Sequence, residues 1–133
     1  MDGPYAVESV VSAADAIAEL WRFLARATRG SGEALAQPST VYSVIGHLVT
    51  AARSAEQVFD QFADWVRGLE ADADLAHDEA PADQHFAVDS AEEVFRWFAR
   101  ASFDVAELER HLHEVHAELS HLYIARETGE GQR

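Results

Sequence analysis

The 133-residue sequence contains no cysteine and no lysine, and it has only three prolines and one methionine. Without cysteine, the chain can form neither disulfides nor thiolate metal sites, and it offers no thiol nucleophile. No run of 18 uncharged apolar residues occurs, which argues against a membrane-spanning helix. The first ten residues lack the basic and apolar segments of an export signal. These absences predict a soluble, cytoplasmic protein that makes no membrane contact.

Positive charge is also scarce. Ten basic residues, all of them arginine, face 24 acidic residues, and the formal net charge is −14. Because such a field repels phosphate backbones, we expect no direct binding to nucleic acid. The acidity is typical of a surface that keeps an apolar-rich chain in solution, and a nucleic-acid mimic or a dock for a basic partner are the alternatives. The lack of lysine beside 25 alanines indicates a GC-rich genome rather than a function.

An apolar rhythm of alternating three- and four-residue steps runs through most of the chain. This spacing keeps one stripe of a helix facing its neighbours. The stripe occurs in three segments of unequal length: Val10, Ala14, Ile17, Trp21 and Leu24; Val41, Ile45, Leu48, Ala52, Ala55, Phe59, Phe62, Val66 and Leu69; and Val94, Phe98, Ala101, Val105, Leu108, Leu112, Val115, Leu119 and Leu122. The pattern predicts an all-α fold, an antiparallel three-helix, coiled-coil-like bundle with one short and two long helices.

We expect a single helical domain over residues 1–133, with helices over about residues 8–28, 40–74 and 90–126. An acidic loop over about residues 70–88 separates the two long helices. Its six clustered acids around Pro81 are typical of a solvated, mobile segment.

Polar residues mark where the long helices begin. Ser39 or Thr40 is the predicted N-cap of the second helix, and Asp89 or Ser90 is the predicted N-cap of the third. No glycine or proline interrupts the third segment, so we predict one continuous helix. A break near Ser102 is the alternative.

The difference in helix length leaves one end of the long hairpin without a third helix. A helix of about 20 residues is roughly 30 Å long, whereas one of 30 to 37 residues spans roughly 45 to 55 Å. Most of the phenylalanine and tryptophan residues fall at the end that stays uncovered. Exposed clusters of this kind mark interaction surfaces. We therefore predict a partner-binding surface made by Phe62, Trp65, Phe95, Trp97, Phe98 and Phe103.

Three occupants could cover this aromatic end. The N-terminal tail with Tyr5, or Phe86 from the acidic loop, could fold over it. A second copy of the chain could pack against it and form a local four-helix bundle. A different protein could supply the missing helix.

Histidines on the third helix raise the question of a metal site. His111, His113, His116 and His121 lie among glutamates, and Glu118 and His121 match the Glu-x-x-His spacing of di-iron bundles. Those bundles need two such pairs and two further inward glutamates, whereas this chain has one pair that flanks the apolar stripe. We predict no metal site, with His113 and His116 on a solvated face. Chelation of a surface ion by these two is the alternative.

The segment Ser43 to Leu48, with His47 near the start of the second helix, resembles the DinB-like metal-binding helical bundles. That resemblance implies a metal-dependent enzyme in which His47 joins a later His-x-x-x-His pair. The four histidines of the third helix contain no such four-residue spacing. No Gly-x-Ser-x-Gly elbow or phosphate-binding loop occurs either. We therefore predict no catalytic residue and no cofactor.

The segment Tyr123 to Glu127 is similar to the Tyr-x-x-x-Asp/Glu export signal of WXG100-type type VII secretion substrates, which pair two long antiparallel helices and often dimerise. The Trp-x-Gly turn of that family is missing. Segments such as Thr40 to Gly46 and Phe62 to Val66 resemble the small, acidic, Ala-rich helical proteins of actinomycetes, found in mobile-element or phage settings. Taken together, the sequence predicts a non-catalytic interaction or assembly protein that dimerises or binds a partner helix.

Overall fold

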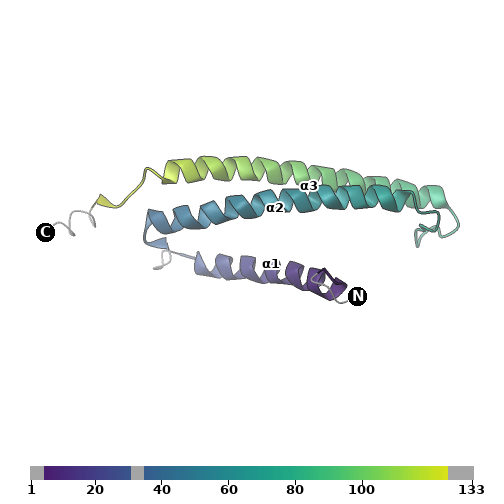
Figure 1. The fold of residues 1–133 in the computed structure, drawn as a ribbon, viewed down its shortest axis with the longest axis horizontal. Coiled ribbons are helices and arrows are strands. Elements are labelled where there is room, and N and C mark those ends of the chain that lie inside the picture. Colours follow the sequence, from purple (N-terminus) through teal and green to yellow (C-terminus); the bar gives the residue numbers. More distant parts are fainter. Residues whose placement is uncertain (1–4, 31–34, 126–133) are drawn as a thin grey trace. The chain divides into compact units, whose positions relative to one another are not determined.

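The computed structural model describes residues 5–30 and 35–125. Its three helices are α1 (Val7–Ala27), α2 (Pro38–Glu70) and α3 (Gln84–Leu119), with 21, 33 and 36 residues. The described ranges contain no strand, only one isolated bridge between His77 and Ala80. The predicted all-α fold with one short and two long helices is confirmed (Figure 1).

The chain divides into two compact units. The larger unit is Tyr42–His121, which holds most of α2 and all of α3. The other combines Met1–Val41 with Leu122–Arg133 and contains α1. The single domain stays a prediction, and so does the packing of the short helix on the hairpin.

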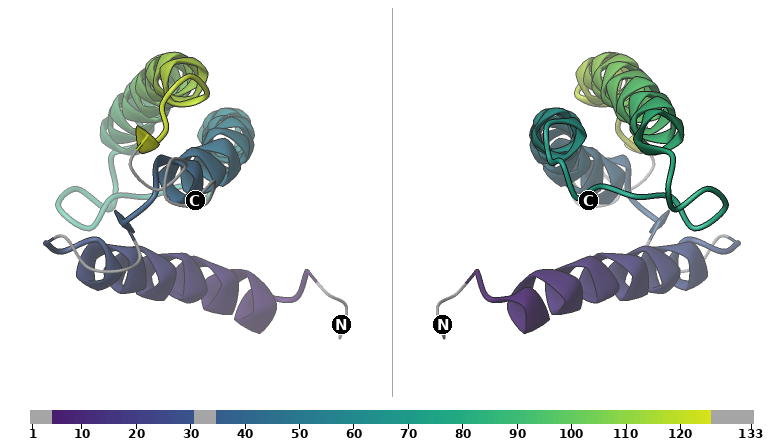
Figure 2. Two further views of the ribbon diagram at one scale, coloured as in Figure 1. Left: turned by 90° about the vertical axis from the view of Figure 1, so that its left-hand side faces the viewer. Right: turned by 90° about the vertical axis from the view of Figure 1, so that its right-hand side faces the viewer.

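Helices α2 and α3 lie side by side and run in opposite directions (Figures 1 and 2). Polar contacts between them fix the register along the hairpin. Arg67 at the loop end pairs with Glu92, and Arg53, further from the loop, pairs with Glu109. Helix α3 is continuous through Ser102, so the alternative of a break at that position is wrong.

The seam between α2 and α3 is built mainly from small side chains. The buried residues are Val49, Ala52, Ala63, Val66, Ala87, Ala91 and Ser102. Alanine and serine allow two helix backbones to approach closely, but they bury little apolar area for each residue. The seam therefore holds the hairpin together without enclosing its larger apolar side chains.

The buried positions differ from the stripe that the sequence predicted. Val49 and Ala63 are buried although they lie one residue beyond Leu48 and Phe62 of that stripe. On α3, three large members of the predicted stripe remain exposed, namely Val94, Leu108 and Val115. Ala52 and Val66 belong to the predicted stripe and are buried, so the stripe is correct in part, and small residues beside it complete the seam.

The ends of the long helices also differ from the predicted bounds. The N-cap of α3 is Asp83, whose Oδ1 accepts a hydrogen bond from the backbone nitrogen of Phe86, so the predicted caps Asp89 and Ser90 lie inside the helix. Helix α2 begins with Pro38, which suits a first turn because proline lacks the N–H that would remain unpaired there.

The connection between α2 and α3, residues 71–83, is anchored at the start of α3. Gln84 donates from Nε2 to the carbonyl oxygens of Asp72 and Ala73. The ring of His77 packs edge-on against Phe86 at 4.7 Å, and His77 Nδ1 accepts a hydrogen bond from the backbone of Glu79. This loop is therefore more than the plain solvated spacer that its acidity suggested.

Candidate partner-binding surface

Three aromatic side chains meet on one face of the α2–α3 hairpin. Phe62 and Trp65 lie one turn apart on α2, and the ring of Phe62 lies 5.3 Å from that of Phe98 on α3. The three side chains line an open hollow of about 340 Å³. Phe62 is 43% exposed and Trp65 is 59% exposed. An open hollow walled by aromatic rings fits an apolar side chain of a partner.

The seam explains why these rings stay open. Ala63 and Val66, the neighbours of Phe62 and Trp65 in the sequence, occupy the contact with α3. The larger side chains are therefore placed beside the seam rather than within it. Val58 and Val94, each one helical turn before Phe62 or Phe98, are exposed as well. We call these five residues the aromatic face: Val58, Phe62, Trp65, Val94 and Phe98.

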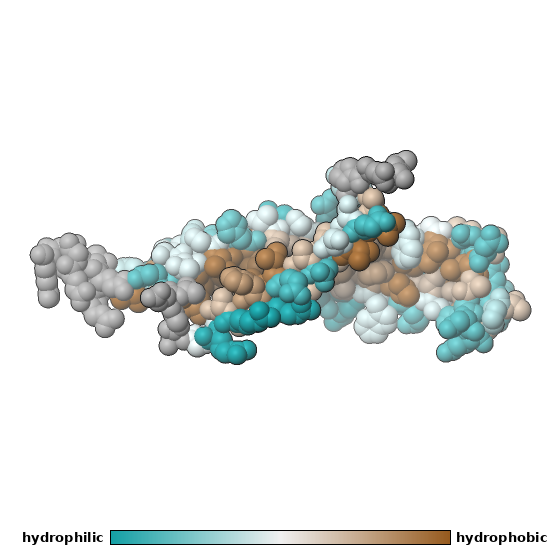
Figure 3. All heavy atoms as spheres, turned by 90° about the horizontal axis from the view of Figure 1, so that it is seen from below, coloured by the Kyte–Doolittle hydropathy of each residue, from teal (hydrophilic) through white to brown (hydrophobic). Residues whose placement is uncertain are grey.

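Large apolar side chains are exposed elsewhere in the described chain too. Figure 3 shows extensive hydrophobic surface, coloured brown, on the side that it presents. The sequence interpretation missed Val58 as a surface residue, although its four-residue spacing from Phe62 was an available indication.

The other three predicted surface residues have different surroundings. Phe95 lies under the guanidinium of Arg67, at 3.6 Å from its ring centroid. Trp97 is 70% exposed and lies about 100° around α3 from Phe98, at the edge of the aromatic face. Phe103 is 59% exposed and lies about 140° around α3 from Phe98, near the guanidinium of Arg100. The structure thus brings three of the six together and does not bring Phe95 and Phe103 to the same face.

Arg67 holds a small charged network around Phe95. Its guanidinium lies 3.1 Å from Glu92 and 3.5 Å from Glu70. Because the guanidinium also covers Phe95, that ring has a partner within its own chain. Phe86, which the sequence placed in the acidic loop as a possible cover of the aromatic end, lies in the first turn of α3 and packs against His77 of the loop.

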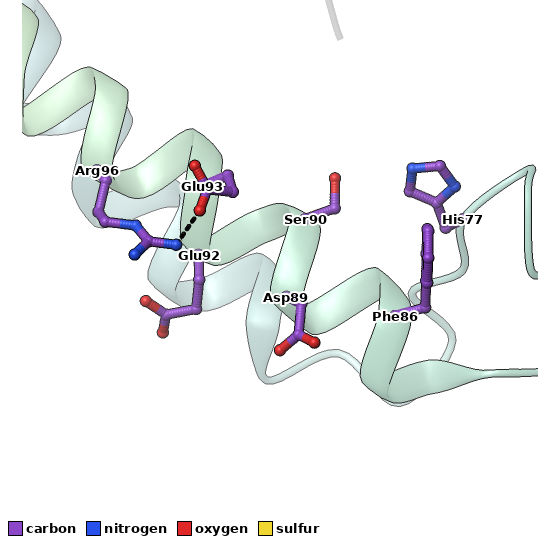
Figure 4. Close-up of a pocket in the computed structure, with 7 residues that line it drawn as sticks. All are labelled: His77, Phe86, Asp89, Ser90, Glu92, Glu93 and Arg96. Carbon is purple, nitrogen blue, oxygen red and sulfur yellow. Dashed lines mark hydrogen bonds and ion pairs between the residues drawn. The ribbon is translucent and has the colours of Figure 1, made fainter.

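A larger hollow, of about 620 Å³, lies near the start of α3 (Figure 4). Its lining is mostly polar and charged: His77, Phe86, Asp89, Ser90, Glu92, Glu93 and Arg96. Arg96 pairs with Glu93 within the hollow. The acidic groups stand apart along the exposed helix surface and do not converge on one point (Figure 4). This hollow therefore has the character of a solvated surface.

Two histidines of α3 contact α2. The ring of His116 stacks on Tyr42 with centroids 3.9 Å apart and also lies against Gly46. His113 Nε2 lies 3.3 Å from a guanidinium nitrogen of Arg53. His113 is exposed, as the sequence predicted, whereas His116 is half-buried against α2 and differs from the predicted solvated face. Across residues 5–30 and 35–125, no group of three or more histidine and acidic residues could hold a metal ion, and the lack of a metal site stays a prediction.

One carboxyl group of α3 shows a shifted titration. The pKa of Glu107 is lowered from its ordinary value because Arg110 donates a hydrogen bond to the carboxylate at 2.7 Å and adds its positive charge. The pair lies at the surface of one helix. It is a local helix-stabilising contact rather than part of a reactive site.

The segment that resembles the export signal lies after α3. Helix α3 ends at Leu119, and Tyr123 is exposed. Glu127, the acidic residue of that resemblance, lies outside the described residues.

Within the part of the chain that the structure describes, no helix is both long enough and apolar enough to cross a membrane. Comparison of the chain with protein-family models, curated proteins and solved structures finds no match.

Proposed function

We propose that this protein is a non-catalytic helical interaction protein whose aromatic face binds a second copy of the chain. The observation that carries the proposal is the open cluster of Phe62, Trp65 and Phe98, which lines a hollow beside a seam made of small residues. Aromatic residues of this kind dominate the binding energy of protein interfaces.

The energetics favour a partner that supplies apolar side chains. Fully burying one large apolar side chain stabilises a contact by roughly 1.5 to 3 kcal/mol. A two-fold contact buries the same aromatic cluster on both copies, so the burial of each side chain stabilises the dimer twice. Packing two hairpins together in this way forms a local four-helix bundle, which is the common solution for an incomplete helical layer.

The length of α1 supports an occupant other than α1 itself. With 21 residues, α1 is about 31 Å long, whereas α3 with 36 residues is about 54 Å long. Wherever α1 lies along the hairpin, it leaves more than a third of α3 without a neighbouring third helix. A second copy is the partner that the chain always has available.

The test compares two variants with equally exposed aromatic residues. Trp65→Asp places a charge on the aromatic face, whereas Phe103→Asp places the same charge on another side of α3; both rings are 59% exposed. In sedimentation velocity at about 50 µM, we expect a dimer for the unmodified protein and for Phe103→Asp, and a folded monomer for Trp65→Asp. A Trp65→Asp protein that remains a dimer would overturn the assignment of the surface.

A type VII secretion substrate is the second candidate function. It is favoured by the long antiparallel hairpin of α2 and α3 and by the resemblance around Tyr123. In a host with a type VII system, export of the unmodified protein that is lost with Tyr123→Ala would support it. Equal retention of both proteins in the cells would contradict it.

A further inference from the structure

The charged residues of α1 occupy one narrow stripe. Glu8, Asp15, Glu19, Arg22 and Arg26 fall within an arc of about 60° when each residue advances 100° around the helix. A helix at the surface of a globular protein usually has the opposite balance, with an apolar stripe of about 100° and a wider polar face. Helix α1 therefore has more apolar surface than one neighbour can cover.

The exposed side chains of α1 confirm the width of this apolar surface. No residue of α1 is buried, and seven of its larger apolar side chains are between 52% and 76% exposed: Val7, Val10, Val11, Ile17, Leu20, Trp21 and Phe23. Around the helix they span an arc of about 240°. One side of this arc is centred on Ile17 and Trp21. The other side is centred near Leu20 and Phe23.

We propose that the Leu20 and Phe23 side of α1 pairs with the same side of α1 from a second copy, with the two helices antiparallel. This contact lies outside the aromatic face and goes beyond the function proposed above. Three features of α1 support an antiparallel partner of identical sequence: the sizes of its side chains, the order of its charges and the direction of its helix dipole.

Side-chain size is distributed along this side in a self-complementary way. Its N-terminal half carries the small residues Ala13 and Ala16, and its C-terminal half carries Leu20 and Phe23. In an antiparallel pair centred near residue 18, Ala13 of one copy lies opposite Phe23 of the other, and Ala16 lies opposite Leu20. Small against large is the arrangement that fills a helix contact without voids.

The order of the charged residues along α1 also favours antiparallel pairing. Two acids, Glu8 and Asp15, lie in the N-terminal half of α1, a third, Glu19, lies just past its middle, and Arg22 and Arg26 lie in the C-terminal half. Antiparallel two-fold pairing keeps the two charged stripes on the same face of the pair, with the acidic end of one copy beside the basic end of the other. Parallel two-fold pairing places the stripes on opposite faces and gains no such attraction. Antiparallel helix dipoles add to the same preference.

The absence of native cysteine allows a direct cross-linking test. Ser9 and Ala27 lie at the centre of the proposed contact side and are 18 residues apart, about 27 Å along the helix. A disulfide needs Cα atoms about 4.4 to 6.8 Å apart, so the two positions cannot be bridged within one chain. In the antiparallel pair, position 9 of one copy faces position 27 of the other.

We expect the double variant Ser9→Cys, Ala27→Cys to form covalent dimers on mild oxidation at about 20 µM, whereas either single variant stays monomeric on a denaturing gel. The matched control is Glu8→Cys, Arg26→Cys, which has the same 18-residue spacing on the charged stripe and should give no covalent dimer. Adding Phe23→Glu to the double variant should reduce its cross-linking at least several-fold.

Other outcomes overturn the proposal. Cross-linking of the single variants would indicate parallel pairing. Equal cross-linking of the control double variant would indicate random collision. If the Ser9→Cys, Ala27→Cys variant does not cross-link, the proposed contact does not exist. Oxidation traps an α1 contact that is too weak to hold a dimer by itself in sedimentation, so Trp65→Asp still sediments as a monomer. Sedimentation of Trp65→Asp therefore reports on the aromatic face and cross-linking reports on α1, and the failure of either contact is recognised separately.

Discussion

The Ser102 hydroxyl on α3 donates a hydrogen bond across the seam to Asp60 Oδ1 on α2, with 2.5 Å between the two oxygens. Ser102 is the one polar residue among the buried residues of the described chain, and its bond joins the two helices near the middle of the hairpin. A hydroxyl in a seam of alanines fixes the register because sliding either helix would leave it without a partner.

Replacing Ser102 tests how closely α2 and α3 approach. Ser102→Ala removes the bond to Asp60 and should lower the free energy of unfolding by about 1 kcal/mol. Ser102→Leu forces a large side chain into the seam and should cost more, about 1 to 3 kcal/mol beyond the alanine variant. Urea unfolding followed by circular dichroism measures both. If Ser102→Leu is as stable as Ser102→Ala, then α2 and α3 do not approach each other at position 102 as closely as in the structure.

Gly46 and Gly68 of α2 differ in the space that an added Cβ would meet, so their alanine variants should differ in stability. A Cβ added at Gly68 meets no atom within 4 Å, so Gly68→Ala should stabilise the protein by about 0.5 to 1 kcal/mol through helix propensity. A Cβ added at Gly46 lies 3.1 Å from His116 Nε2. Gly46→Ala should therefore gain less, because His116 must shift from its stack on Tyr42.

Thermal unfolding of the two glycine variants gives the comparison. The double variant Gly46→Ala, His116→Ala lacks the obstructing ring. Its Tm should exceed that of His116→Ala alone by about as much as Gly68→Ala raises the Tm of the unmodified protein. An equal increase in Tm for Gly46→Ala and Gly68→Ala would contradict the close contact.

The pKa of Glu107 gives a prediction about pH. Because it lies below the ordinary value of 4.5, the ionised carboxylate contributes stability that is present above about pH 4.5 and is lost as the pH falls through the folded pKa. Arg110→Gln removes the hydrogen bond and the positive charge, so the pKa should rise towards 4.5. Arg100→Gln, which removes a partner of Asp104 instead, should leave it unchanged. Carbon-detected NMR titration of the Glu107 carboxyl measures each value, and a pKa unaffected by Arg110→Gln would refute the assigned cause.

The number, type and relative lengths of the helices could be predicted from the sequence, because long apolar periodicity determines helix type strongly. The start of α3 could not. The first turn of α3 lies at the end of an acidic stretch whose composition is typical of a loop, yet Ala87 in this turn is buried. Burial of that alanine, together with the Asp83 cap, stabilises a turn that local composition disfavours.

The position of the seam could be predicted only in part, since Ala52 and Val66 of the predicted stripe are buried but other seam residues lie outside it. Periodicity places the largest apolar side chains at the contact, but here Ala63 and Ser102 occupy it, and Phe62 and Val94 stay at its edge. Which of two adjacent stripes faces the partner helix depends on how the whole pair packs, and apolar spacing alone does not encode it. The sequence had grouped six aromatic residues together, but Phe95 lies under Arg67 and Phe103 lies near Arg100, away from the hollow of Phe62, Trp65 and Phe98.

The effect of salt concentration on affinity distinguishes an apolar contact between identical copies from a binding site for a basic partner. Two chains with a net charge of −14 repel each other, and added salt screens that repulsion. A homodimer formed through the aromatic face should therefore become tighter as NaCl rises, whereas binding of a basic partner should weaken.

Sedimentation equilibrium of the unmodified protein measures directly whether the chain pairs with a second copy of itself. Over about 1 to 300 µM and in 50 and 500 mM NaCl, we expect a monomer–dimer equilibrium with a micromolar Kd that becomes lower at the higher salt concentration. A single species with the mass of one chain, 14.7 kDa, over the whole range at both salt concentrations would contradict it.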